Sequence, residues 1–279
     1  MLHSQPDAPN YVLALEELER HLDWHSLLID GHIWKWLDTG GNGAVAMLLP
    51  GSVGDGGMFV STLSALGSSF RLVSVTYPAL FEPEKLADGL SLVMGHLHIE
   101  SALVVGSSFA AFWAQYFALR HPQKVSGLVI GNGLVDGNDL TYDPLFAHDY
   151  LESVSPKALH EAWIERVGSP PTTALKHFQK FMLTERQTPE NLYARFRGVG
   201  KASACPPLSL PMKSITVLDC DDDPLIPFYV RERMRLCYPG ANHITFTVGG
   251  HYPHLLNQIE YQSLLVEILK GISPARISV

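Results

Sequence analysis

The sequence has few cysteines, and their spacing excludes the usual structural roles of this residue. Cys205, Cys220 and Cys237 are odd in number, and no two of them form a C-x-x-C pair. A disulfide framework uses an even number of cysteines, and structural zinc sites draw on closely spaced pairs. We therefore expect ordinary packing residues, with no disulfide framework, no bound metal and no cofactor.

Basic residues are also scarce. Lys and Arg number 20 against 28 Asp and Glu, which gives a formal net charge of -8. Nucleic acids are bound through a basic face, and no local cluster of Lys and Arg reverses the acidic balance here. Nucleic-acid binding is therefore not expected, and the expected partner is a small molecule.

Long apolar runs are missing as well. No uncharged apolar stretch reaches the length of a membrane-spanning helix. The N-terminus has neither the basic flank nor the apolar run of a signal peptide. These features predict a cytoplasmic protein without a membrane span, and they give no indication of its oligomeric state.

The length and hydrophobic content are those of a protein with one large core. After an amphipathic helix at Tyr11–Leu22 and a hairpin turning at Asp30-Gly31, short apolar runs alternate with helical stretches. This alternation is typical of a parallel sheet covered by helices on both faces. The strands of that sheet are predicted at Val45–Leu49, Leu72–Thr76, Ala102–Val105, Leu128–Ile130, Ile215–Leu218 and Ile244–Val248. The helices are predicted at Met58–Leu66, Pro83–Leu97, Phe109–His121, Pro227–Cys237 and Gln258–Lys270.

The alternation fails once, between about Asp139 and Leu210, where helical periodicity continues without a strand. We predict a helical cap at 139–210, inserted between late strands of a core formed by residues 1–138 and 211–279. Open parallel sheets bind ligands beyond the carboxyl ends of their strands, where such a cap would lie. An apolar acyl or alcohol pocket is predicted from the cap aromatics Trp163, Phe178 and Phe181. Arg195 and Arg197 could meet a substrate carboxylate, although solvated surface arginines are commoner.

A candidate nucleophile stands between a buried strand and a helix. The pattern Gly106-x-Ser108-x-Ala110 follows an apolar run and opens a helical stretch. A serine at such a strand-to-helix turn has its hydroxyl exposed, and small neighbours let the backbone reverse closely. Serine is also a common helix cap, but the strand–turn–helix context favours a nucleophile at Ser108.

A serine hydroxyl needs a base and a group that orients the base. His251 follows the last predicted strand in a glycine turn, and His254 is its competitor. Asp223 precedes Pro224, which fixes the loop, and gives the chain order Ser, Asp, His. The competitors for the acid are Asp136, Asp219 and Asp222.

Acyl transfer also requires backbone N–H groups that stabilise an oxyanion. Phe109, directly after the nucleophile, is one expected donor, and Ser52 or Val53 in the glycine-rich loop after the first parallel strand is the other. A dinucleotide phosphate loop is not predicted there, because the spacing is not G-x-G-x-x-G.

These motifs resemble those of the α/β-hydrolase superfamily, over nearly the whole chain from about Leu27. The resemblance rests on the serine elbow, Asp-Pro-Leu-Ile-Pro at 223–227 and Gly-Gly-His-Tyr-Pro-His at 249–254, and it implies an α/β-hydrolase fold. Val75–Pro78, Leu236–Ala241 and Gly249–Pro253 resemble the maspardin-like branch, which implies a role in protein interaction. Pro50-Gly51 stands where relatives often carry His-Gly.

The function predicted from these residues is hydrolysis of a carboxylic ester, a lactone or a thioester through an acyl-enzyme. The reacting groups are predicted to be Ser108, His251 and Asp223. Two alternatives are kept: cleavage of a carbon–carbon bond by the same residues, and a non-catalytic binding or adaptor role.

Overall fold

The computed structural model describes residues 9–41 and 43–272. Within this part of the chain, eight strands form one sheet in the order β1-β2-β4-β3-β5-β6-β7-β8. β1 pairs antiparallel with β2 and β2 with β4, while all the other neighbours are parallel. The predicted mostly parallel sheet is confirmed. The strands are β1 (Trp24–Ile29), β2 (His32–Asp38), β3 (Val45–Leu49), β4 (Arg71–Thr76), β5 (Ala102–Ser107), β6 (Val125–Gly131), β7 (Ile215–Cys220) and β8 (Asn242–Phe246).

The predicted hairpin forms between β1 and β2. Asp30 and Gly31 both have positive φ, at 49° and 79°. Two successive residues with positive φ give a turn whose twist matches that of the flanking strands. The hairpin thereby adds two antiparallel strands to one edge of the sheet, beside β4.

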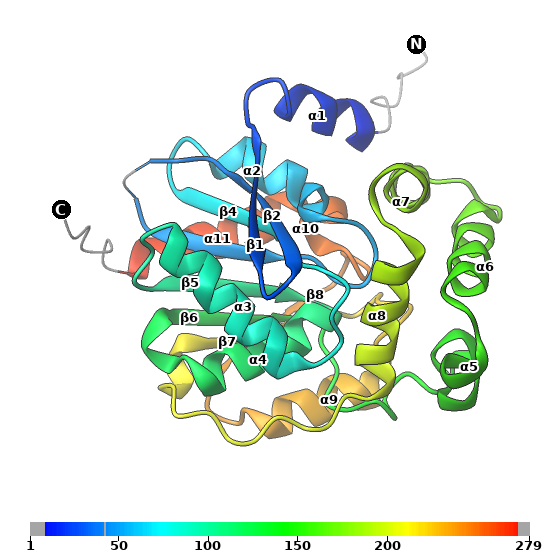
Figure 1. Cartoon of the computed structure of the whole chain (residues 1–279). Coiled ribbons are helices and arrows are strands. Elements are labelled where there is room, and N and C mark those ends of the chain that lie inside the picture. Colours follow the sequence, from blue (N-terminus) through cyan, green and yellow to red (C-terminus); the bar gives the residue numbers. More distant parts are fainter. Residues whose placement is uncertain (1–8, 42, 273–279) are drawn as a thin grey trace, which may run out of the picture.

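Helices cover both faces of the sheet, as Figure 1 shows. In β3, Met47 and Leu49 point to one face and Ala46 and Leu48 to the other, because successive strand side chains alternate. The first face packs against α3 (Pro83–His96), α4 (Phe109–Arg120) and α9 (Phe228–Cys237). The second packs against α2 (Val60–Leu66) and α11 (Gln258–Gly271). Two apolar layers therefore hold the sheet, which is why β3 is buried along its whole length.

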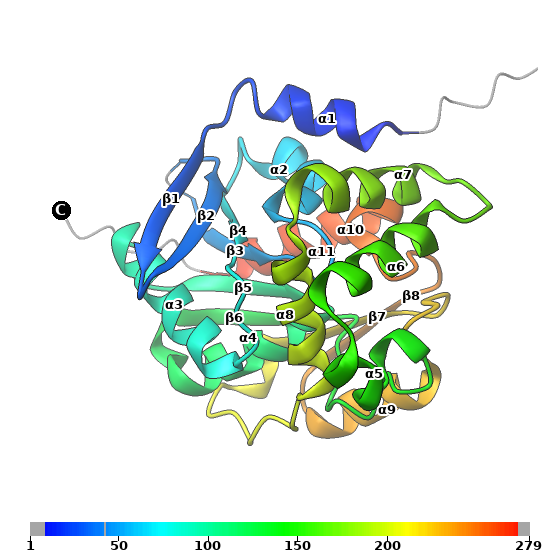
Figure 2. The same cartoon turned by 45° about the vertical axis from the view of Figure 1, so that its right-hand side comes forward.

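The helical region between β6 and β7 (residues 139–210) consists of helices joined by turns and irregular segments, and it contains no strand among the described residues. Figure 2 shows it beside the strand ends, with α8 between the sheet and the outer helices. α1 (Tyr11–Leu18) and the short α10 (Pro253–Leu256) also contact this region, because Tyr11 and Leu255 share a buried cluster with Phe178. Its helices are α5 (His148–Ser153), α6 (Pro156–Gly168), α7 (Ala174–Phe181) and α8 (Pro189–Gly200).

Several predicted boundaries differ from the structure by two to four residues, and β6 begins at Val125 and not at Leu128. β8 covers Asn242–Phe246 and not Ile244–Val248, and α1 ends at Leu18 and not at Leu22. β8 is an edge strand in which only Phe246 is buried, so the apolar pattern does not mark its first residues.

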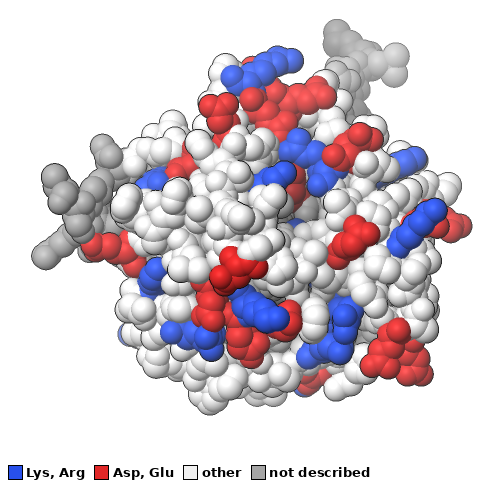
Figure 3. Space-filling model, in the orientation of Figure 1, with Lys and Arg blue, Asp and Glu red and all other residues white. Residues whose placement is uncertain are grey.

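None of the helices in the described ranges has both the length and the apolar character needed to cross a membrane. On the face drawn in Figure 3, acidic and basic side chains are interspersed.

Candidate active site

Ser108 lies at the sharp turn between β5 and α4. Its φ is +55°, a conformation that costs energy for any residue with a side chain and that clusters at functional sites. The turn is tight, because a Cβ on Gly106 would lie 2.5 Å from the carbonyl oxygen of Ala110. Glycine at 106 is therefore required, whereas alanine at 110 is accommodated.

The structure brings the three predicted reacting residues together. His251 Nε2 lies 2.8 Å from Ser108 Oγ, and His251 Nδ1 lies 2.8 Å from Asp223 Oδ2. The side chains of His251 and Asp223 are almost completely buried, and Ser108 is half-buried. With the Nδ1 proton on the Asp223 side, Nε2 is free to accept the proton of the serine hydroxyl.

The carboxylate of Asp223 is held by a set of hydrogen bonds. Its Oδ1 accepts the backbone N–H groups of Leu225 and Ile226 at 2.7 and 3.1 Å, and its Oδ2 accepts Asn132 Nδ2 at 2.6 Å. Burial alone would raise the pKa of Asp223. The adjacent His251 and these hydrogen bonds outweigh burial, so the pKa lies below its usual value and the carboxylate is ionised at neutral pH.

Sequence reasoning missed Asn132. Besides holding Asp223, its amide donates to the carbonyl oxygen of Gly250 at 3.2 Å, so that it ties the acid to the turn that carries His251. Asn132 has φ +47° and stands between Gly131 and Gly133 at the end of β6. Asparagine tolerates this left-handed conformation. An Asn flanked by glycines directly after a buried strand was therefore the sequence feature that could have identified this residue.

The other acidic candidates have different partners. Arg233 Nη2 lies 2.6 Å from Asp136 Oδ2, and Arg235 Nη2 lies 2.8 Å from Asp219 Oδ2. Asp222 accepts the backbone N–H of Gly250 at 2.7 Å. It thus shapes the glycine turn before His251 without contacting the imidazole.

His254, the other candidate base, lies in the core with 2% of its surface exposed. Its ring packs 4.6 Å from that of Phe59, centroid to centroid, and its Nε2 has no hydrogen-bond partner in the described structure. Burial, with a smaller effect from His251, lowers the pKa of His254 to about 3. At neutral pH it is a neutral packing residue.

This burial predicts a pH-dependent stability. An unfolded histidine binds a proton below pH about 6.5, whereas folded His254 does so only near its lowered pKa of about 3. In that interval the unfolded state binds more protons, so the free energy of unfolding falls with falling pH, by up to about 1.4 kcal/mol per unit. His254→Phe should remove this part of the slope. Urea unfolding at about pH 5 and pH 7 gives the free energy of unfolding of the variant and of the unsubstituted protein. If the difference between the two proteins were the same at both pH values, the prediction would be contradicted.

The loop after β3 passes directly over Ser108. A Cβ placed on Gly51 would lie 3.0 Å from Ser108 Cβ and 3.6 Å from its Oγ. Among the described residues, no acceptor is hydrogen-bonded to the backbone N–H of Ser52, Val53 or Phe109. These are the three N–H groups that the sequence proposes for an oxyanion.

A cavity of about 430 Å³ adjoins His251 beneath the helical region. Trp163 lines it together with Val167, Leu175 and Leu225. The predicted pocket residues Phe178 and Phe181 are not among its lining residues. The ring of Phe178 packs against that of Tyr11 on one side and Phe181 on the other, where they join the helical region to α1.

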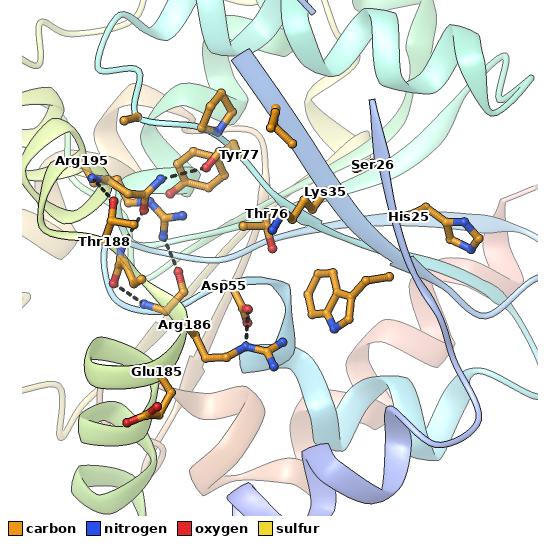
Figure 4. Close-up of a pocket in the computed structure, with 17 residues that line it drawn as sticks. His25, Ser26, Lys35, Asp55, Thr76, Tyr77, Glu185, Arg186, Thr188 and Arg195 are labelled. Atoms are coloured by element: carbon orange, nitrogen blue, oxygen red, sulfur yellow. Dashed lines mark hydrogen bonds and ion pairs between the residues drawn. The ribbon is translucent and has the colours of Figure 1, made fainter. Parts of the chain in front are cut away.

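A larger hollow of about 680 Å³ borders the same loop through Gly54 and Asp55. Figure 4 shows it between the β1–β2 hairpin, which supplies His25 and Lys35, and the helical region, which supplies Arg186. Ser108, His251 and Asp223 do not line it.

The expectation of a solvated arginine is wrong for Arg195. Its side chain is completely buried and faces backbone carbonyl groups of the loop after β3, because that side of α8 packs on the loop. Arg197 is half-buried, with its Cζ 4.5 Å from the centroid of the Phe81 ring. Neither arginine lines the cavity beside His251.

In the described ranges, no group of three or more His, Cys, Asp or Glu side chains is placed to hold a metal ion.

Comparison with known proteins places this geometry in a family. The model of the alpha/beta hydrolase family matches residues 24–259. Maspardin of Mus musculus is 22% identical over 247 residues, which cover 86% of this chain and 79% of that protein. The putative carbamate hydrolase RutD of Klebsiella pneumoniae (strain 342) is 24% identical over 261 residues, covering 82% and 92%. Both the superfamily resemblance and the maspardin-like resemblance read from the motifs are confirmed.

Solved structures give the same fold. A thermophilic esterase from Thermogutta terrifontis has a TM-score of 0.71 at 19% identity, covering 89% of this chain and 98% of that one. A variant of the meta-cleavage product hydrolase CumD has a TM-score of 0.68 at 18% identity, covering 88% and 98%.

Proposed function

The chain belongs to the alpha/beta hydrolase family, and on that premise we propose that it is a serine hydrolase of a carboxylic ester, a lactone or a thioester. The observation that carries this proposal is the hydrogen-bonded series Ser108–His251–Asp223, with 2.8 Å at each link. The backbone N–H groups of Phe109, Ser52 and Val53, which have no acceptor among the described residues, support it as candidate oxyanion donors.

In the proposed reaction, His251 Nε2 takes the hydroxyl proton of Ser108 as Oγ bonds to the substrate carbonyl carbon. The carbonyl oxygen becomes an oxyanion, which the N–H of Phe109 and of Ser52 or Val53 stabilises. The tetrahedral intermediate collapses to an acyl-enzyme, and His251 gives its proton to the departing alcohol or thiol. Water then attacks the acyl-enzyme with the same base, releasing the acid and restoring Ser108. Asp223 stays ionised and stabilises the imidazolium.

The test of this function is labelling with a fluorophosphonate serine probe, followed by a panel of nitrophenyl esters. We expect the label on Ser108, located by peptide mapping, and turnover of at least part of the panel. The similarity to maspardin favours a second candidate, a non-catalytic binding or adaptor role. Absence of both label and turnover would make that role the better account.

Trp163 is expected to influence which acyl chains are accepted. Its ring lines the cavity beside His251, so Trp163→Phe enlarges that cavity while an aromatic ring still packs near Phe146. The ratio of kcat/KM for long and short acyl chains should shift by about tenfold or more, the scale of a lost pocket contact. Rates across the nitrophenyl ester panel measure it.

The matched control is Phe178→Leu, which alters an aromatic outside that cavity and next to Tyr11. It should lower thermal stability and leave the acyl preference unchanged. If Phe178→Leu shifted the preference and Trp163→Phe did not, the acyl pocket would lie nearer α1.

A further inference from the structure

One of the two N–H groups that would stabilise the oxyanion belongs to the glycine-rich loop after β3, so the backbone of this loop must be held in one orientation. We propose that Arg195, from the helical region between β6 and β7, is a positioning residue that turns the backbone N–H of Ser52 toward Ser108, and that Gln187 from the same region supports it by fixing the adjacent Ser52–Val53 peptide. The proposal rests on the proposed hydrolase function and assigns part of the oxyanion site to the helical region.

Arg195 reaches from α8 to two carbonyl groups of this loop. Its Nη1 donates to the carbonyl oxygens of Gly51 at 2.8 Å and Gly54 at 2.7 Å. Its Cζ lies 4.1 Å from the centroid of the Tyr77 ring, and Figure 4 shows the two side chains next to each other. The Tyr77 hydroxyl in turn lies 2.8 Å from the carbonyl oxygen of Pro50 and 3.0 Å from that of Gly51. The start of the loop is thus held from one side.

Gln187 makes a second attachment to the same loop. Its Oε1 accepts the backbone N–H of Gly54 at 2.8 Å, and its Nε2 donates to the carbonyl oxygen of Ser52 at 2.8 Å. Asn191 supports it, since its Oδ1 accepts from Gln187 Nε2 at 2.9 Å. Asn191 and Arg195 are four apart in α8, a spacing that puts their side chains on one side of the helix, and Gln187 lies in extended backbone two residues before α8 begins. That side of α8 and the segment just before the helix therefore face the loop.

Because the peptide group is planar, fixing the carbonyl group of Gly51 also fixes the direction of the N–H of Ser52. In a trans peptide the carbonyl group of one residue and the N–H of the next point in opposite directions. With the carbonyl of Gly51 turned toward Arg195 and Tyr77, the N–H of Ser52 points away from them. A Cβ placed on Gly51 would lie 3.0 Å from Ser108 Cβ, so the backbone at Gly51 passes close to the nucleophile, and this geometry favours Ser52 as the donor.

The burial of Arg195 supports a role beyond packing. Its Nε and Nη2 have no hydrogen-bond partner within the described chain, and no carboxylate is hydrogen-bonded to the guanidinium group. Placing a cation in such a site opposes folding, and an apolar side chain fills space at a lower cost. The guanidinium group of Arg195 contacts the carbonyl groups of the loop instead. Pro50-Gly51 is thereby anchored by Tyr77 and Arg195, which are remote in the sequence.

The experiment compares Arg195→Met and Gln187→Leu with Arg197→Met, a control from the same helix that does not contact the loop. If the N–H of Ser52 loses its direction, kcat should fall on the order of a hundredfold in Arg195→Met, with KM little changed. The affinity for a trifluoromethyl ketone, which forms the oxyanion, should fall by a similar factor. The affinity for the corresponding methyl ketone should not change. A general loss of stability would not weaken the binding of one ketone and leave that of the other unchanged.

If Arg195→Met does not fold, Gln187→Leu and Tyr77→Phe provide the same test. In these variants kcat and the affinity for the trifluoromethyl ketone should each fall by about tenfold. Full kcat and full trifluoromethyl ketone affinity in the folded variants, together with loss of turnover in Ser108→Ala, would refute the positioning role alone. Absence of turnover and label in the unmodified protein would refute the proposed function instead. In that case, amide exchange of residues 51–54 should still accelerate in Arg195→Met and not in Arg197→Met, and equal exchange would refute the positioning role too.

Discussion

Replacing Ser108 with alanine is expected to lower kcat/KM for a nitrophenyl ester by at least about a thousandfold and to leave the fold intact. Ser108 Oγ is the hydroxyl bound to His251 Nε2, so its loss removes the nucleophile of the proposed reaction. Removing the hydroxyl group opens no core cavity, since Ser108 is half-buried at the edge of the site. Steady-state kinetics gives the loss, and circular dichroism with thermal unfolding verifies the fold.

The neighbouring Ser107 provides the control. It ends β5 and is buried, and no hydrogen bond joins it to His251 in the described structure. Ser107→Ala should keep most of the activity and the fluorophosphonate label. Near-full activity in Ser108→Ala with Ser107 unchanged would show that the nucleophile or the mechanism has been misassigned.

The second large effect is expected at Asp223. Asp223→Asn should reduce kcat/KM by about ten-thousandfold, the scale seen when a triad aspartate is amidated. An amide can donate to His251 Nδ1, which moves the ring proton to Nε2 and leaves no acceptor for the Ser108 hydroxyl. The lowered pKa of Asp223 keeps its carboxylate ionised through the neutral range, so the unsubstituted protein retains the acceptor for the Nδ1 proton there.

Asp136→Asn is the matched control, because Asp136 is the alternative acid from the sequence. Its carboxylate is paired with Arg233 and does not contact His251, so the variant should change kcat/KM only slightly. Kinetics of both variants beside His251→Ala would decide the assignment. A large loss in Asp136→Asn with a small one in Asp223→Asn would place the acid after β6.

Much of the fold and the residues at the centre of the candidate site could be predicted because the relevant signals are local. β3 and β5 are buried on both faces, so each appears as an unbroken apolar run. The turn at Asp30-Gly31 and the elbow at Ser108 are each specified within a few residues, by tolerance of positive φ and by small neighbours. The glycine pair before His251 is likewise a local feature, because both glycines have positive φ in the turn.

The tertiary structure separates Asp223 from the acids beside it. Pro224 and the chain order favour Asp223 in the sequence, but Asp219 and Asp222 follow the same predicted strand, and only the contacts of the folded loop show which carboxylate faces His251. Only the folded loop shows Asp222 bonded to the turn of Gly250 while Asp223 meets the imidazole.

Sequence by itself determined the layered α/β architecture, the helical region after β6 and the identities of Ser108 and His251 as candidates, since periodicity and turn chemistry depend on adjacent residues. The tertiary structure alone decided the strand order, the burial of Arg195 and the packing of Phe178 against α1. Arg195 is 144 residues from Gly51, and Ser108 is 143 from His251. The hydrophobic periodicity of the sequence does not reveal contacts across such separations, because they depend on how whole elements pack and not on the sequence neighbours of either residue.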